Sequence, residues 1–328
     1  MYRIIKNKGG YDKTYILIIQ TKMRHYILKR LLNTIPIIII VSILIFLFIH
    51  LIPGDPARLL AGHQATLEEI TIMRDQLGLN DPMYLQYFNF VKDFFSGDLG
   101  ISIKTGLPIK EMLIPRFKPT LYLAIFSIVW ASILGVITGI ISAVNRGKIL
   151  DYFVMIIAIS GISLPLFWLG LMLIQVFSVN LGWFPTGGID GFKSYVLPSI
   201  TLGAGIMSMI ARYTRSSMIE ILNEPYIRTS RAKGLSEIFI VGKHALRNSL
   251  IDVVTIVGLQ FGFLLAGSVL VETVFSIPGL GRLLIDSILF RDYTVIQVIL
   301  LIFTLQFIVV NLVVDVMYGV LNPKIRYE

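Results

Sequence analysis

Apolar residues gather in six long runs that alternate with polar segments along the chain. A run of about 18–20 apolar residues is long enough to cross a bilayer as a helix. The runs cover residues 31–52, 120–144, 149–179, 196–209, 251–271 and 295–321. The third is longer than a bilayer requires and contains Gly161, Pro165 and Gly170, which predicts a kink or a tilt. The fourth is short and rich in small residues, which suits close helix packing, and its helix could continue to Met218. The pattern predicts an all-α polytopic membrane protein with six transmembrane helices.

The polar segment 53–118 is too long for a structureless connection and predicts helices of its own. The first, over 66–77, opens on a threonine cap followed by acidic residues and stops at a glycine. The second runs from residue 81 or 82 to residue 95 and is rich in aromatic side chains. These rings either anchor at a membrane surface, where aromatic side chains are enriched, or form part of a lid or of a receiving surface for an external protein. They belong to Tyr84, Tyr87, Phe88, Phe90, Phe94 and Phe95.

The polar segment between the fourth and fifth runs is predicted to form a helix, a turn and a second helix, because proline, glycine and serine stand at the positions where helices begin and end. Pro225 suits a first helical turn, where its missing N–H is not needed. Gly234 suits the left-handed position just past a helix end. Ser236 can cap the second helix, with Glu237 adding negative charge to the first turn. A helix over 225–233 would be a rod roughly 13 Å long.

The predicted rod has two different surfaces. Arg228 and Arg231 lie three residues apart and share a face, whereas Tyr226 and Ile227 offer an apolar surface. Spacing alone leaves two interpretations open: a solvated hairpin, or a surface on which a partner docks.

Lysine and arginine are distributed unevenly between the polar segments. The first 30 residues carry eight basic side chains against one acidic side chain, and residues 212–247 carry seven basic ones. In the segment 53–118, seven basic side chains face eight acidic ones. Because basic residues collect on the cytoplasmic side of membrane proteins, both termini and the loop 212–250 are predicted to be cytoplasmic. The formal net charge of +9 is then a topology signal, and no nucleic acid partner is expected.

Composition excludes several kinds of chemistry. The chain is 55% hydrophobic and 15% charged, with no cysteine, which excludes disulfides, thiolate catalysis and sulfur-ligated metals. It lacks the Gly-x4-Gly-Lys-Ser/Thr pattern that holds nucleotide phosphates. The four histidines lack metal-ligand spacing, so neither a metal nor a cofactor is expected. An intramembrane protease built on Ser163 would need a base at the same depth, and no histidine lies in a central run. The chain is therefore not expected to be an enzyme.

Polar side chains inside the apolar runs are costly in lipid and should face other helices or a pathway. Gln260 is the first candidate for a translocation pathway, followed by Gln175 and Asn311. The alternative for each, and for Gln306, is an interhelical hydrogen bond. Asp315 lies near the end of the last run, where it is expected to meet water.

Two charged residues flank the outer end of the fifth run. Glu272 directly follows the last residue of that run, and Arg282 follows a glycine ten residues later. They are candidates for an outer gate or for contact with an external binding protein. The alternative is that both are solvated loop charges.

The stretch Tyr226-Ile-Arg-Thr-Ser-Arg-Ala-Lys-Gly234 resembles the coupling helix of bacterial ABC importer permeases, the loop that presses into a cleft on the ATPase. Where the general pattern has Glu-Ala-Ala, this chain has Arg228, Thr229 and Ser230, which is similar to the peptide/nickel group of that family. One departure is Asp252, where those permeases usually carry proline. Further similar stretches cover residues 53–56, 77–82, 97–102, 160–165, 175–183, 244–248, 271–282, 291–297 and 321–327.

The resemblance implies a type I ABC importer permease fold in a bacterial plasma membrane. It implies four kinds of partner: a second homologous permease, two ATP-binding subunits, an external substrate-binding protein and the lipid membrane. ATP-driven import of small peptides is the expected function, and the amino-acid sequence around 160–186 is most similar to the glutathione-importing branch. The coupling residues are then Glu224, Tyr226, Arg228, Thr229, Ser230, Arg231, Ala232, Lys233 and Gly234.

Other functions stay open at this point. Import of nickel or a metal chelate is the main alternative, because the binding protein usually selects the substrate. An ion-driven secondary transporter would require carboxylates in mid-membrane, and these are scarce. A scaffolding membrane protein is a third possibility.

The predicted organisation has five parts. An N-terminal cytoplasmic extension covers 1–22, unless translation starts at Met23, and the first transmembrane helix lies within 23–52. An external helical segment covers 53–118, and a permease core covers 119–321, with its coupling loop at 212–250. The cytoplasmic tail is 322–328.

Overall fold

The structure is a computed structural model that describes residues 13–51, 55–62 and 65–321. More than half of the predicted N-terminal extension, and all of the predicted tail, lie outside these residues. The described part of the chain is helical, and its only β-type pairing is an isolated bridge between Ile101 and Pro108. The α-helices are α1 (Lys13–Leu51), α2 (Pro56–Ala61), α3 (Leu67–Gln76), α4 (Met83–Ser96), α5 (Ile109–Val144), α6 (Ile149–Ser163), α7 (Leu166–Leu173), α8 (Lys193–Leu222), α9 (Pro225–Ala232), α10 (Glu237–Phe239), α11 (Leu246–Val274), α12 (Leu280–Leu289) and α13 (Tyr293–Leu321). Two π-helical segments, η1 (Ile174–Asn180) and η2 (Ile240–Ala245), follow α7 and α10.

Four helices are long and apolar enough to cross a membrane without a break. They are α1, α5, α8 and α13. Two bent pairs, α6 with α7–η1 and the two halves of α11, bring the number of spans in the described residues to six if each pair crosses once. The predicted run 120–144 is only part of α5, and the predicted run 196–209 is only part of α8, because both helices continue into polar sequence. Helix α11 also begins earlier than predicted and runs through Asp252 without interruption.

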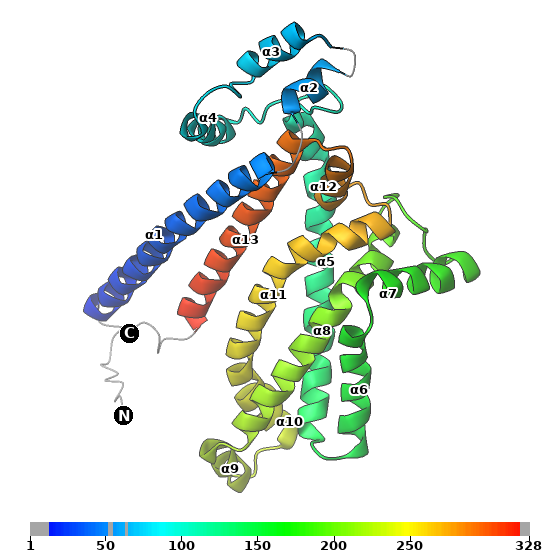
Figure 1. The fold of residues 1–328 in the computed structure, drawn as a ribbon. Helices are drawn as coiled ribbons and strands as arrows, with labels where there is room; N and C mark the ends of the chain where they lie inside the picture. Colours follow the sequence, from blue (N-terminus) through cyan, green and yellow to red (C-terminus); the bar gives the residue numbers. More distant parts are fainter. Residues whose placement is uncertain (1–12, 52–54, 63–64, 322–328) are drawn as a thin grey trace.

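The bend predicted in the third run is present and sharp. Helices α6 and α7 meet at an angle of 105°, so α7 projects sideways from the bundle (Figure 1). Leu164 has an extended backbone, and Pro165 occupies the residue before the first turn of α7. Because the residue before a proline is pushed out of the helical conformation, the chain breaks here and not at either glycine.

Helices α5 and α8 form the centre of the bundle. Gly139 of α5 faces Thr214 and Ala211 of α8, and a side chain there would lie 2.6 Å from Thr214 Cβ. Gly203 of α8 similarly faces the ring of Trp130. Of the four continuous spans, α8 is the most buried, which agrees with the packing role predicted from its small residues.

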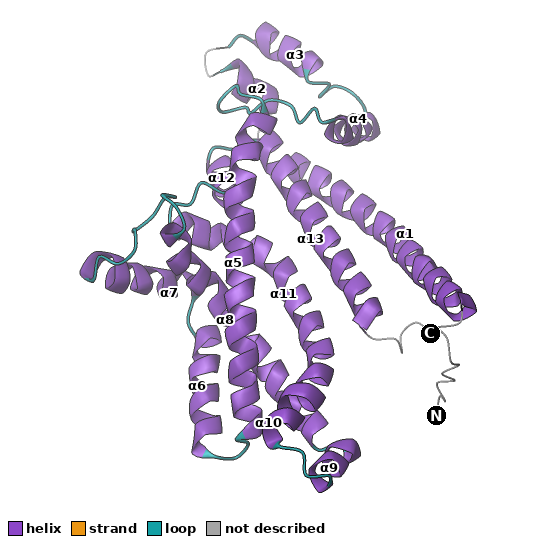
Figure 2. Ribbon diagram, turned by 180° about the vertical axis from the view of Figure 1, so that it is seen from behind, coloured by secondary structure: helices purple, strands orange, loops and turns teal. Residues whose placement is uncertain are grey.

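Helices α1 and α13 run side by side along one flank of the bundle (Figures 1 and 2). Arg30 of α1 and Asp315 of α13 form an ion pair, with 3.1 Å between Nη1 and Oδ2. The expectation that Asp315 simply meets water is therefore incomplete, because its carboxylate also ties the last helix to the first.

The two ends of the bundle carry different structures. Helix α9 and the α5–α6 turn lie at one end, called the α9 end, whereas α2, α3, α4 and α12 gather at the opposite end (Figure 1). Both helices predicted in 66–95 are present. Thr66 and Glu69 form a reciprocal capping box at the start of α3, and α4 begins directly after Pro82.

Candidate functional site

The α9 hairpin has the local geometry that its sequence predicts. Pro225 begins α9, and Gly234 adopts a left-handed φ of +77° two residues after its end. The amide of Gly234 donates to the carbonyl of Arg231 at 2.9 Å, and the amide of Leu235 donates to that of Ser230 at 3.4 Å. These two bonds form a Schellman motif, which stops the helix and turns the chain back.

The inner side of α9 is fixed to the start of α11. Ile227 is completely buried, and the hydroxyl of Tyr226 accepts a hydrogen bond of 2.9 Å from Asn248 Nδ2. Of the two residues predicted to form an apolar surface on α9, Ile227 is therefore covered by the rest of the chain and is not available to a partner. Tyr226 stays partly exposed with its hydroxyl directed inward.

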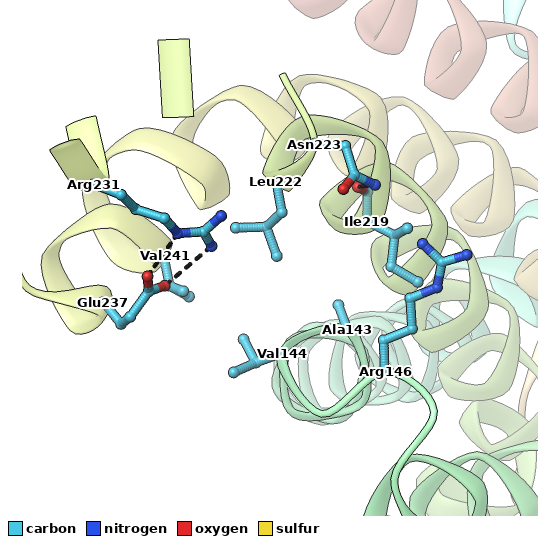
Figure 3. A pocket seen from close by; sticks show the side chains of 9 residues that line it. All are labelled: Ala143, Val144, Arg146, Ile219, Leu222, Asn223, Arg231, Glu237 and Val241. Atoms are coloured by element: carbon cyan, nitrogen blue, oxygen red, sulfur yellow. Dashed lines mark hydrogen bonds and ion pairs between the residues drawn. The ribbon is translucent and has the colours of Figure 1, made fainter. Parts of the chain in front are cut away.

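The two arginines of α9 have different partners. The Arg231 guanidinium donates to both carboxylate oxygens of Glu237, at 2.6 and 3.2 Å, and so braces the turn (Figure 3). This guanidinium lowers the pKa of Glu237, and the ion pair is therefore intact at neutral pH. Arg228 is exposed and forms no ion pair with the residues that the structure describes. Arg228 is thus the arginine that α9 leaves available to a partner.

The other predicted coupling residues complete the outer surface of α9. Thr229 and Ser230 donate their hydroxyls back to carbonyls one turn earlier, at 3.1 and 2.9 Å. Glu224 occupies the N-cap position with no side-chain capping bond. Glu224, Thr229, Ala232 and Lys233 are exposed, whereas Ser230 is half-buried.

A groove lies beside α9, between the ends of α5 and α8 on one side and the start of the second hairpin helix on the other (Figure 3). Arg231 and Glu237 lie on one side of it and Arg146 on the other. The lining residues are Ala143, Val144, Arg146, Ile219, Leu222, Asn223, Arg231, Glu237 and Val241. Ala143 also packs with Met218 and Ala245 in a small buried cluster that joins α5, α8 and η2.

A buried ion pair that the sequence analysis missed joins three helices near this end. Asp151 of α6 receives two hydrogen bonds from Arg215 of α8, 2.9 Å from Nε and 2.8 Å from Nη2. Ser142 of α5 donates its hydroxyl to the same carboxylate, and the amide of Gly147 donates at 3.0 Å. Asp151 is almost fully buried. The sequence did contain a signal for this ion pair: Asp151 is a carboxylate at the start of an apolar run, and such a group must find a partner.

The three pathway candidates lie on different elements. Gln175 is exposed in η1 and donates to Asn180 at 3.0 Å. Gln260 lies in α11 and Asn311 in α13, and each is half-buried. Among the described residues, no hydrogen bond joins any two of the three. The three side chains therefore lie on three different elements and are not hydrogen-bonded to one another.

Glu272 is an internal anchor at the opposite end of the bundle. Its side chain is 0% exposed and accepts hydrogen bonds from Thr120 Oγ1 at 2.7 Å and from the amide of Arg282 at 3.0 Å. A side chain on Gly279 would collide with this carboxylate and with Thr120 Oγ1. The interpretations of Glu272 as a solvated loop charge or as a direct contact for a binding protein are wrong, because α12 covers it. Arg282 remains half-buried.

Asp292 is a second internal carboxylate at that end. It is 2% exposed and accepts hydrogen bonds from the hydroxyl of Ser102 and from the amides of Ile103 and Lys104, at 3.2 and 3.3 Å for the amides. It also stands just before the first turn of α13. Asp292 therefore ties the loop before α5 to the start of the last span. No group of histidine and carboxylate side chains in the described residues is arranged to hold a metal ion.

Comparison with known proteins gives consistent matches over most of the chain. Residues 135–327 match the family described as binding-protein-dependent transport system inner membrane component, and residues 23–124 match the corresponding N-terminal family. The glutathione transport system permease protein GsiC of Escherichia coli K12 is 54% identical over 306 residues, which cover 93% of this chain and 100% of that protein. GsiC of Shigella flexneri matches to the same extent.

Two solved transporters share the fold. The MetNI methionine ABC transporter, in an inward facing conformation, matches with a TM-score of 0.57 and 22% identity over 66% of this chain and 98% of that chain. An amino acid ABC transporter matches with a TM-score of 0.52 and 14% identity over 64% of this chain and 94% of that chain.

The ion pair of Asp151 and Arg215 gives a stability prediction. Arg215→Gln should lower the stability of the protein by about 3 kcal/mol or more, because it leaves the buried carboxylate of Asp151 without its counter-charge. Asp151→Asn should cost less, because the Arg215 side chain that it leaves unpaired is 29% exposed. The double variant should lose less than the sum of the two, because neither charge remains. Thermal unfolding of the detergent-solubilised protein measures all three. Arg146→Gln, an exposed arginine at the same end, should change stability by less than about 0.5 kcal/mol. Strictly additive losses would contradict the pairing.

Proposed function

Because the chain belongs to the family of binding-protein-dependent transport system inner membrane components, we propose that it is the permease subunit of an ATP-driven importer of small peptides, with glutathione as the first substrate to test. The observation that carries the substrate class is the 54% identity to the whole length of the GsiC glutathione permease. The chain itself contributes membrane spans and a docking hairpin, and the ATP-binding pattern is absent from its sequence.

The α9 end is proposed to face the cytoplasm of a bacterial cell, with the protein in the plasma membrane. Seven basic side chains lie between Arg212 and Arg247, the part of the sequence that contains α9, and the short α5–α6 turn adds Arg146 and Lys148. Basic residues in short loops next to spans set the cytoplasmic side. With this orientation, both termini are cytoplasmic and the segment 55–108 lies outside.

The partners follow from this orientation. A second permease would complete the membrane part, and two ATP-binding subunits would sit beneath the α9 ends. An external substrate-binding protein would approach the end that carries α2, α3 and α12. The exposed face of α9, with Arg228 and Lys233 as its cations, is proposed to dock on one ATP-binding subunit. Charge complementarity predicts an acidic surface on that subunit.

Movement of α9 has three physical routes into the bundle. Helix α9 follows directly on α8 through the two residues after Leu222. Ile227 and the bond from Asn248 to Tyr226 attach α9 to the start of α11. The ion pair of Asp151 and Arg215 then connects α8 to α5 and α6. Closure of the ATP-binding subunits would therefore shift several spans together between inward- and outward-facing states.

The pathway residues remain a proposal within this mechanism. Gln260 lies on α11, the span that α9 contacts, and forms no side-chain hydrogen bond with the described residues. Gln175 and Asn311 are the further candidates on η1 and α13. Amide groups both donate and accept hydrogen bonds, so these side chains would bind the peptide bonds and carboxylates of a small peptide.

Gly234→Val is predicted to abolish transport while leaving membrane insertion intact. The β-branched side chain is strained at a φ of +77° by a kcal/mol or more, so the hairpin would lose its docking geometry. ATP-dependent uptake into vesicles and the amount of protein in the membrane fraction measure the two effects. Gly242→Ala is the matched control, since Gly242 has open space and no left-handed φ. Normal uptake by Gly234→Val would rule out the coupling role.

The substrate assignment is tested by uptake of labelled glutathione into vesicles that hold the complete complex with its binding protein. Saturable uptake that an unlabelled dipeptide does not displace is the expected result. Displacement by dipeptide would move the substrate to peptides in general, and displacement by chelated nickel would favour a metal-chelate importer. Uptake that persists after ATP depletion, with the ion gradient maintained, would instead indicate a secondary transporter.

A further inference from the structure

Helix α4 exposes three aromatic side chains along one stripe. Tyr84, Phe88 and Phe95 are 76, 63 and 70% exposed, and they are separated by four and seven residues. At 3.6 residues per turn, this spacing places all three on the same side of the helix. Three large rings on one face of a short helix form an apolar surface that water does not favour.

A neighbouring stripe of α4 packs against α1 and α13, and its contacts show which ends of these spans α4 lies beside. The ring of Phe46, near the end of α1, lies 5.5 Å from that of Tyr87 and 6.3 Å from that of Phe90. The hydroxyls of Ser42 and Tyr87 are hydrogen-bonded at 2.8 Å. Phe94 packs against the buried cluster at the start of α13. Helix α4 is therefore attached where one apolar span ends, near Phe48, and another begins, at Tyr293.

The orientation of α4 suits the surface of a bilayer. Both views show α4 nearly end-on while α1 and α13 run along the picture, so α4 crosses these spans (Figures 1 and 2). Asn89, Asp93 and Ser96 lie on the side of α4 away from the packed rings, and Asn89 and Asp93 are exposed. The helix thus has one stripe that packs against the spans, an adjacent apolar stripe that is exposed, and a polar stripe.

We propose that the stripe of Tyr84, Phe88 and Phe95 inserts into the lipid headgroup layer at this end of the bundle. Leu44 and Phe48 of α1, on either side in sequence of the Phe46 that packs against α4, are also strongly exposed. Aromatic rings are favoured at the boundary between headgroups and acyl chains, and amphipathic helices lie in that layer with their apolar side down. The proposal requires α1 and α13 to span the membrane and does not depend on the transported substrate.

Lipid fits this stripe better than a soluble protein partner does. A binding protein that docks and leaves would return three aromatic rings to water after each cycle. The charged residues Lys92 and Asp93, which would steer such a partner, lie outside the stripe. A lipid-anchored α4 would also hold the segment 65–96 at a constant height above the spans.

The absence of cysteine from the chain allows a direct test. The variants Phe88→Cys and Asn89→Cys are each labelled with a nitroxide. Each is part of a complete complex whose other subunits lack reactive cysteines. The complex is reconstituted in phosphatidylcholine–phosphatidylglycerol vesicles. Power-saturation spectroscopy then measures accessibility to oxygen, which dissolves in lipid, and to a water-soluble nickel chelate. We expect the label at 88 to favour oxygen and the label at 89 to favour the nickel chelate, by several-fold in each case. Tyr84→Cys should repeat the result of Phe88→Cys.

Three outcomes would overturn the proposal, provided that uptake shows the labelled complexes to be intact. Equal access of the nickel chelate to positions 88 and 89 would place the stripe in water. Low access of both reagents at position 88 would indicate burial by a second permease. Protection that appears only when the binding protein is added would identify the stripe as a docking surface.

Discussion

A carboxylate buried inside the protein must be paired or hydrogen-bonded by the protein itself, and this constraint determines how the helices are joined. Asp151 is held by a bidentate arginine, a hydroxyl and an amide, whereas Glu272 and Asp292 are held by hydroxyls and by backbone amides. Each carboxylate connects segments that are distant in sequence. Unpaired, each would cost several kcal/mol, so the helices are fixed relative to one another wherever a carboxylate is buried.

The two ends of the bundle use this constraint differently. At the end with α12, Glu272 and Asp292 lock short helices onto the spans and leave little freedom. At the α9 end, one side of the hairpin is buried through Ile227, while its other side, with Arg228, is exposed. Such a hairpin can accept force from a partner on one side and pass it to α8 and α11 on the other. The two ends therefore differ: one holds its carboxylates inside the protein, and the other exposes one side of a hairpin.

Features set by neighbours in sequence were predictable. The capping threonine of α3, the break before Pro165 and the left-handed Gly234 each depend on a few adjacent residues, and all three are present. Partners across the bundle were not predictable, because periodicity gives a helix its faces but does not say which helix lies against each face. Thus the ion pair of Asp151 was overlooked, and the apolar surface that includes Ile227 could not be assigned a partner. The proposed substrate and partners come from the likeness to known permeases, since spacing alone cannot distinguish a docking hairpin from a solvated one.

The most direct test of the account is to ask what touches α9 in the working complex. A photo-crosslinking amino acid is placed at position 228, and in a second variant at position 193, an exposed lysine at the far end of α8. The account predicts that position 228 crosslinks to an ATP-binding subunit and that position 193 does not. If position 228 crosslinked to an external protein, or to no subunit of a complex that hydrolyses ATP and transports, α9 would not be the coupling element.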